Sequence, residues 1–123
     1  MLRKNITYTD YDGVERTETF YFNLSKAELL KMEMTTVGGM QARIQKIVDA
    51  KDTVQVVNMF NDIIMAAYGE KSDDGKRFIK SKELSEAFAQ TPAYDELFFE
   101  LLSDPDKATA FMQAIVPAEA LQK

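Results

Sequence analysis

The best candidate for a metal-binding segment is residues 69–84, with the sequence GEKSDDGKRFIKSKEL. If Gly75 took the sixth position of a twelve-residue calcium loop, the first, third and fifth positions would be Glu70, Ser72 and Asp74. The twelfth position, which needs a bidentate glutamate, would be Ser81, and the apolar eighth position would be Arg77. The segment therefore fits a turn at Gly75 followed by a helix cap at Ser81 better than it fits a calcium site.

Neither cysteine nor histidine occurs in the 123 residues. Their absence excludes disulfide bonds, thiol nucleophiles, histidine bases and the usual zinc and iron ligand sets. Catalysis by carboxylates alone would need a metal-binding set or two carboxylates in a cleft, and no spacing singles out such a set. We therefore expect a protein that is not an enzyme and that uses no cofactor.

The charge and the apolar content limit the classes of partner. The formal net charge of -5 argues against nucleic acid, because general affinity for a phosphate backbone comes from clustered lysine and arginine. No run of 18 apolar residues occurs, and the start MLRKNITYTDYDG lacks the apolar centre of a signal peptide. We expect a cytoplasmic protein with neither a nucleic-acid nor a membrane partner.

Residues 3–22 are expected to form a β-hairpin, because apolar and polar side chains alternate on both sides of the turn DYDGV. A two-residue loop would place Ile6 opposite Thr19, whereas a three-residue loop over residues 11–13 pairs even positions with even ones. The second register gathers five apolar side chains on one face: Ile6, Tyr8, Val14, Phe20 and Phe22. It also puts Gly13 at the left-handed position, so we prefer it. That face should dock on helices or on another subunit's sheet.

Residues 25–117 are expected to be mostly helical. Ser25 and Glu28 have the spacing of a capping box at the start of a helix over residues 26–35. Apolar residues at helical spacing then predict a second helix over residues 40–51.

Four further helices are expected along the rest of the chain. The first is strongly apolar, begins after Asp52 and includes Tyr68. The other three follow the capping residues Ser81, Thr91 and Asp104. Residues 118–123 are expected to fray. The expected fold is therefore α+β, a single domain over residues 1–123 with an N-terminal β-hairpin followed by a mostly α-helical bundle of about six helices.

Two groups of apolar residues are candidates for contact with a partner. The first is a methionine cluster beside the break at Gly38 and Gly39, made of Met32, Met34 and Met40. Flexible thioethers suit surfaces that adapt to varied partners, although methionine at helical spacing also fills cores. The second group is the hairpin face, made of Tyr8, Phe20 and Phe22.

An acidic set follows Pro92: Asp95, Glu96, Glu100, Asp104 and Asp106. Asp95 and Glu96 fall in the first turn of a helix, where negative charge interacts favourably with the helix dipole, so helix stability accounts for part of the set. The alternative is a surface that attracts a basic partner.

Residues 68–117 resemble the tail assembly chaperones of long-tailed phages and prophages of Gram-positive bacteria. The shared pattern has a Tyr-Gly at a helix end, a Ser/Asp/Gly turn, F-I-K-S-x-E-L, F-x-Q-T-x-A-Y, L-F-x-E-L and A-x-x-F-x-x-x-I-V-P. The matching positions are Tyr68, Gly69, Asp74, Gly75, Phe78, Lys80, Ser81, Leu84, Phe88, Thr91, Ala93, Tyr94, Leu97, Phe98, Leu101, Phe111, Ile115 and Pro117. The N-terminal F-x-L-S-K-A-E-L segment is also similar, so the resemblance spans nearly the whole chain.

This resemblance implies a role without catalysis. Such proteins bind the long, helical tape measure protein, keep it soluble while tail tube subunits polymerise around it, and leave before the virion matures. It also implies the host bacterial cytoplasm as location, with the tail tube protein and a second copy of the chain as further partners. The alternative is a small phage or prophage structural adaptor that stays in the virion.

Overall fold

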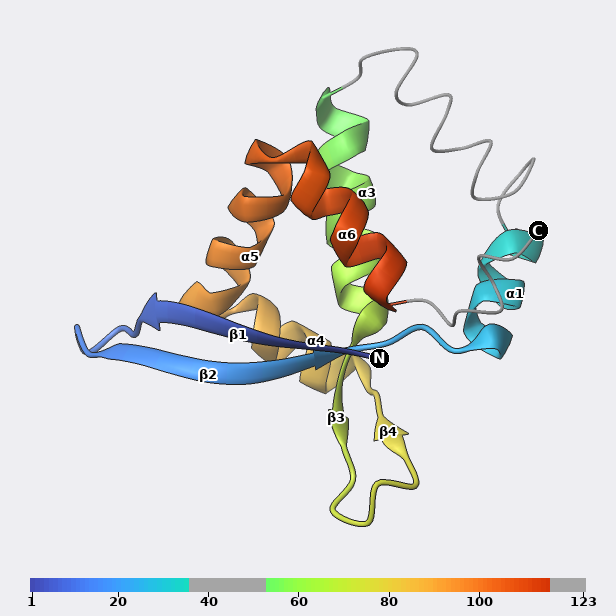
Figure 1. The fold of residues 1–123 in the computed structure, drawn as a ribbon, viewed down its shortest axis with the longest axis horizontal. Coiled ribbons are helices and arrows are strands. Elements are labelled where there is room, and N and C mark those ends of the chain that lie inside the picture. The colour runs from blue at the N-terminus through green and yellow to red at the C-terminus, as the bar shows by residue number, and fades with distance from the viewer. Residues whose placement is uncertain (36–52, 116–123) are drawn as a thin grey trace.

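The computed structural model describes residues 1–35 and 53–115 of the chain. Its elements are β1 (Leu2–Thr9), β2 (Glu15–Phe22), α1 (Lys26–Thr35), α3 (Thr53–Ala67), β3 (Tyr68–Lys71), β4 (Phe78–Ile79), α4 (Lys82–Ala89), α5 (Pro92–Ser103) and α6 (Pro105–Ile115) (Figure 1). The fold is therefore α+β with an N-terminal hairpin. The described residues hold five helices rather than about six, and the helix expected at 40–51 lies outside them, as does the tail at 118–123.

The hairpin has the expected register. Ile6 lies opposite Glu18 and Leu2 lies opposite Phe22, so even positions pair with even ones. The three-residue loop is closed by the amide of Asp10, which donates to the carbonyl of Val14 at 2.9 Å. Gly13 has a φ of 81°, a left-handed conformation that glycine adopts without a steric penalty.

The connector before α4 differs from the expectation. It is a second hairpin, β3 and β4, and the four strands form one sheet in the order β1-β2-β3-β4. Tyr68 begins β3 instead of ending α3. The strands approach closely at Gly69, where a Cβ would lie only 2.6 Å from the Phe78 ring and 2.7 Å from the carbonyl of Ile79. Two hairpins, rather than one hairpin and a purely helical region, therefore make up the β part of the fold.

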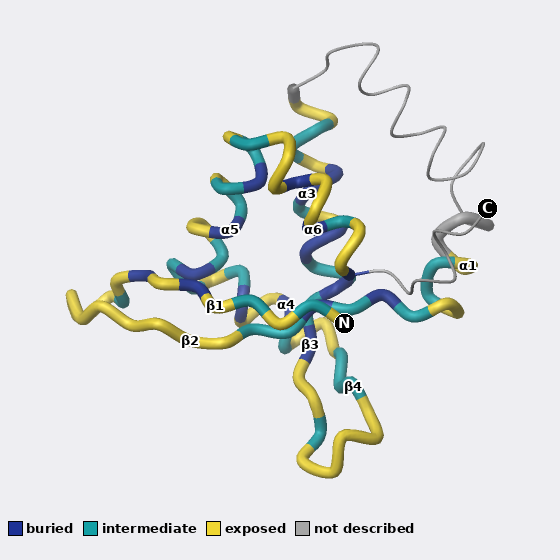
Figure 2. Tube along the Cα trace, viewed as in Figure 1, coloured by how far each residue is buried: buried dark blue, intermediate teal, exposed yellow. Residues whose placement is uncertain are grey.

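The core lies between the even face of the first hairpin and the helices. Figure 2 shows buried positions on the sides of α3, α5 and α6 that face inward and along part of β1. Aromatic rings join the two layers, because Phe22 lies 5.7 Å from Phe88 in α4 and 5.4 Å from Phe111 in α6 between ring centroids. The odd face of the hairpin is polar and exposed, and there the hydroxyls of Thr7 and Thr17 are 2.9 Å apart.

Side chains cap three of the helices as expected. Ser25 and Glu28 form the reciprocal capping box of α1, with hydrogen bonds of 2.9 and 3.1 Å. The Ser81 hydroxyl accepts from the amide of Leu84 at 3.0 Å, and the Asp104 carboxylate accepts from the amides of α6. The expectation for Thr91 is only half right. It occupies the N-cap position before Pro92, but its hydroxyl donates to the carbonyl of Phe88 at 2.7 Å and caps no amide.

Candidate partner-binding surfaces

The hairpin residues predicted to contact a partner lie in the core of this chain. Phe22 has no exposed surface and Tyr8 is also buried, while Phe20 is partly buried and its ring centroid lies 5.1 Å from that of Phe88. The even face thus docks on the chain's own helices, one of the two outcomes expected for it. Contact of these residues with a partner stays a prediction, and the burial of Tyr8 and Phe22 leaves little of them accessible.

The methionine cluster cannot be assembled from the described residues. Met32 and Met34 fall in α1, but the burial of their side chains is not described, and Met40 lies outside the described residues. Among the described side chains of α1, Leu30 is 61% exposed and Leu29 packs against the core. The helix that carries the first two methionines therefore also presents an apolar residue to solvent.

Lys80 holds α1 near the end of α3. Its ammonium group donates to the carbonyl of Asn23 at 2.5 Å, to Glu28 Oε2 at 2.7 Å and to the carbonyl of Ala66 at 2.8 Å. Burial by itself would raise the pKa of the Glu28 carboxyl, but hydrogen bonds from Lys80 and from Ser25 outweigh it and lower that pKa. Sequence reasoning missed this role, because the only signal was a lysine directly after two apolar residues.

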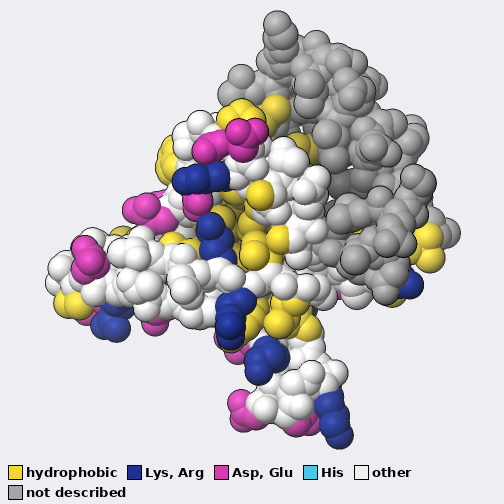
Figure 3. All heavy atoms as spheres, viewed as in Figure 1, with side chains coloured by type: hydrophobic (Ala, Val, Ile, Leu, Met, Phe, Trp, Pro, Cys, Tyr) yellow, Lys and Arg dark blue, Asp and Glu magenta, His cyan; other side chains and the backbone are white. Residues whose placement is uncertain are grey.

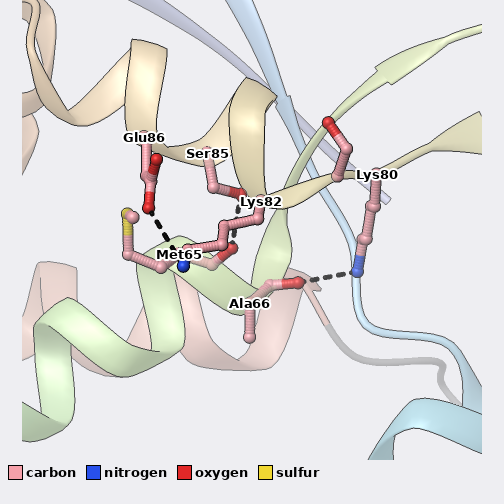
Figure 4. Close-up of a pocket in the computed structure, with 7 residues that line it drawn as sticks. Met65, Ala66, Lys80, Lys82, Ser85 and Glu86 are labelled. Atoms are coloured by element: carbon pink, nitrogen blue, oxygen red, sulfur yellow. Dashed lines mark hydrogen bonds and ion pairs between the residues drawn. The ribbon is translucent and has the colours of Figure 1, made fainter.

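A hollow of about 480 Å³ lies beside this cluster, between the end of α3 and the start of α4 (Figure 4). Met65 and Ala66 provide apolar lining, and the Ser85 hydroxyl fixes the wall by donating to the carbonyl of Met65 at 2.9 Å. Lys82 and Glu86 form an ion pair of 3.7 Å at its rim.

Phe99 of α5 is, with Tyr11, one of the two aromatic residues that are strongly exposed among the described side chains. We define the α5 patch as Tyr94, Phe98, Phe99 and Leu102. Phe99 is 65% exposed, and the ring centroids of Tyr94 and Phe98 lie 5.6 Å apart, those of Phe98 and Phe99 6.0 Å apart. The other three members are partly buried and connect Phe99 to the core.

Two members of the acidic set border the α5 patch. Asp95 and Glu96 are exposed and precede Phe99 by four and three residues, which places them beside it on the helix surface. Burial and, next, the charge of Asp95 raise the pKa of the Tyr94 hydroxyl. Glu100 instead accepts from Lys4 of β1 at 3.3 Å and lies 3.7 Å from Lys107, so its charge is paired within the chain.

In residues 69–84, the segment compared with a calcium loop, the carboxylate of Asp74 stabilises a turn. Asp74 accepts hydrogen bonds from the hydroxyl of Ser72 at 2.7 Å and from the amide of Lys76 at 3.0 Å, and Gly75 has a φ of 74°. Figure 3 shows charged side chains of both signs around this turn. In residues 1–35 and 53–115, no group of three or more carboxylates is placed to hold a metal ion.

None of the helices described has the length and apolar character needed to cross a lipid bilayer.

Comparisons with known proteins identify the family. No curated protein and no solved structure matches the chain significantly. The family model described as phage tail assembly chaperone, in contrast, matches residues 1–123. Because that match covers the whole sequence, the chain belongs to the phage tail assembly chaperone family.

Proposed function

We propose that this chaperone binds the tape measure protein, keeps it soluble and promotes assembly of the tail tube around it, without catalysis. The observation that carries the proposal is the family match over residues 1–123. A long helical partner that awaits its tube exposes apolar stripes, and a protein that covers them prevents aggregation. The exposed apolar residues of this chain support such a role.

The α5 patch is the contact surface that we favour. Interface hot spots are often large aromatic side chains that a partner buries completely, and Phe99 is an exposed aromatic side chain of this helix. Asp95 and Glu96 beside Phe99 would attract lysine or arginine flanking the apolar stripe of the partner. The expected ligand is therefore an amphipathic helix of the tape measure protein with basic residues next to its apolar face.

Co-expression with the cognate tape measure protein tests the function. We expect the soluble fraction of the tape measure protein to rise with the chaperone and the two proteins to co-purify. An unrelated acidic protein of similar size serves as the control for non-specific solubilisation. An unchanged soluble fraction together with the absence of a complex would contradict the proposal.

The proposal also places the chaperone in the host bacterial cytoplasm, encoded by a phage or prophage, and outside the mature virion. Mass spectrometry of purified virions should then find the tape measure protein without the chaperone. Stoichiometric amounts of this chain in virions would instead indicate the structural adaptor. The tail tube protein is a further proposed partner, to be tested by the same co-purification.

A further inference from the structure

One edge of β2 has no strand partner near the hairpin tip in the described part of the chain. Asp10 and Val14 share a main-chain hydrogen bond, so the alternation of an antiparallel ladder turns the amides and carbonyls of Glu15, Thr17 and Thr19 away from β1. Side-chain hydrogen bonds agree with this alternation, because the Thr7–Thr17 pair is of the closer, non-hydrogen-bonded type. On the far side, β3 pairs only with residues 21 and 22.

This open edge has neither a proline nor a bulge to block another strand. Natural edge strands are blunted by charged residues, proline or a bulge, and β2, with the sequence ERTETFYF, has charged residues alone and pairs with β1 without interruption. In Figure 1 the tip half of the hairpin extends away from α1 and from β3, and no element drawn lies along its outer edge. The edge therefore offers three residues of main-chain donors and acceptors to an incoming strand.

The charges of β2 select its own copy in one register. Two β2 strands paired antiparallel about Thr17 place Glu15 opposite Thr19 and Arg16 opposite Glu18 of the second copy, in both directions. A centre at Arg16, at Glu18 or at Glu15 would instead oppose two like charges, and a centre at Thr19 would need Tyr21, which already pairs with Gly69 of β3. With the centre at Thr17, the three residues whose main chain faces away from β1, Glu15, Thr17 and Thr19, all fall in hydrogen-bonded pairs with the second copy.

We propose that two copies of this chain associate by antiparallel pairing of their β2 strands about Thr17. The same register brings the hairpin tip of one copy beside the angle between β2 and β3 of the other. That angle holds a hollow of about 280 Å³, lined by residues 18–21 and 68–71. Two apolar residues at the tip, Tyr11 and Val14, are 84% and 50% exposed, and the pairing gives them a surface to contact.

The expected dimer is weak and depends on protein concentration. The paired segment is short, so the interface is smaller than the roughly 1,600 Å² of a standard stable complex. Sedimentation velocity over a range of concentrations should show a monomer–dimer equilibrium. The pairing uses only this chain, so it can be tested without the tape measure protein and its failure would leave the proposed chaperone function untouched.

Cysteine cross-linking tests the register directly, because the natural chain has no cysteine. The two copies of Thr17→Cys would face each other with about 5.5 Å between Cα atoms, which a disulfide spans. The matched control is Thr7→Cys, exposed on the same face of the hairpin but on β1. Mild oxidation should cross-link the Thr17→Cys protein and not the control. Equal yields from the two variants would overturn the proposed pairing.

A charge exchange gives a second, independent measurement. Arg16→Glu should weaken the dimer about tenfold, because it opposes two carboxylates at both symmetric positions. Adding Glu18→Arg restores opposite charges between the copies, although two contacts within the chain are lost, that of Arg16 with Asp10 and the hydrogen bond from Tyr8 to Glu18. Recovery of the dimer in the double variant supports the pairing, and equal weakness of both variants contradicts it. Circular dichroism confirms that each variant is folded.

Discussion

At the scale of single residues, Lys80 connects separate elements of the fold through hydrogen bonds from one charged side chain. It is about one-fifth exposed, and its three acceptors come from the segment before α1, from α1 itself and from the end of α3. Two of these acceptors are main-chain carbonyls that would lose a partner without it. Lys80 therefore helps to hold α1 in place, together with Leu29, which packs against the core.

Lys80→Met tests this role. We expect the free energy of unfolding to fall by about 2 kcal/mol, because the loss of a partly buried donor leaves two main-chain carbonyls without this partner. Lys82→Met is the matched control, since its side chain is 89% exposed and forms only a surface ion pair with Glu86, so the change should stay within about 0.5 kcal/mol. Urea denaturation measures both variants. Equal destabilisation of the two would refute the role of Lys80.

Glu28 predicts a dependence of stability on pH. The folded protein holds its pKa below the ordinary value of 4.5, so the unfolded chain binds a proton more readily in that range. The contribution of Glu28 is thus complete above pH 4.5 and is lost as the pH falls below it. Glu28→Gln should lose less stability than the natural protein between neutral pH and the acid range. Glu83→Gln, exposed in α4, should follow the natural protein, and parallel curves for all three would contradict the prediction.

At the scale of elements, the second hairpin depends on the absence of one side chain. Gly69→Ala would place a Cβ within 3 Å of Phe78 and of the carbonyl of Ile79, so we expect a loss of about 1–3 kcal/mol. Gly75→Ala meets no atom within 4 Å and is strained only by its positive φ, at a cost of about 1 kcal/mol. Thermal unfolding compares the two. A Gly69→Ala protein as stable as the natural one would show that β3 and β4 do not approach as described.

The α5 patch predicts which helix contacts the tape measure protein. Phe99→Ser should weaken the complex roughly tenfold while leaving the free chaperone stable, because the side chain is exposed in the free protein. Leu30→Ser is the matched control, with 61% exposure on α1. Co-purification and calorimetry measure both. A larger effect of Leu30→Ser would move the site to α1, beside the predicted methionine cluster.

Charge at the same patch can be separated from its apolar contacts. Asp95→Asn combined with Glu96→Gln should weaken the complex and flatten its dependence on salt, since the two carboxylates lie beside Phe99. The control pair, Asp73→Asn with Glu83→Gln, removes the same net charge from exposed positions elsewhere. Identical salt dependence of the two double variants would exclude a specific role for the acidic residues.

At the scale of the whole molecule, Phe22 joins the first hairpin to α4 and α6 through ring contacts. Phe22→Ala should cost about 3–5 kcal/mol and should destabilise sheet and helices together. Far-ultraviolet circular dichroism, which reports mainly helix, and tyrosine fluorescence, to which three tyrosines of the first hairpin contribute together with Tyr68 and Tyr94, should give coincident unfolding curves. Separate transitions would contradict the single domain predicted from the sequence.

Local patterns in the sequence were sufficient for much of this fold. The hairpin register, the start of α1 and the caps at Ser81 and Asp104 depend on neighbours within a few residues, so the side chains that set them are adjacent in the chain. The family was likewise visible in short motifs. What the sequence determined by itself is therefore the first hairpin with its register, the starts of three helices, the lack of cysteine and histidine, and the membership of a family of assembly chaperones.

The tertiary structure decided which apolar residues are accessible and how distant segments meet. Tyr8, Phe20 and Phe22 of the first hairpin face the helices, whereas Phe99 of α5 faces solvent. The spacing of apolar residues in the sequence does not distinguish the buried side chains from the exposed one. Strand β3 pairs with β2, which is far away in sequence, and Lys80 meets Glu28 52 residues away. The physical reason is common to all three: burial, strand pairing and ion pairing are properties of two surfaces, and a sequence segment specifies only one of them.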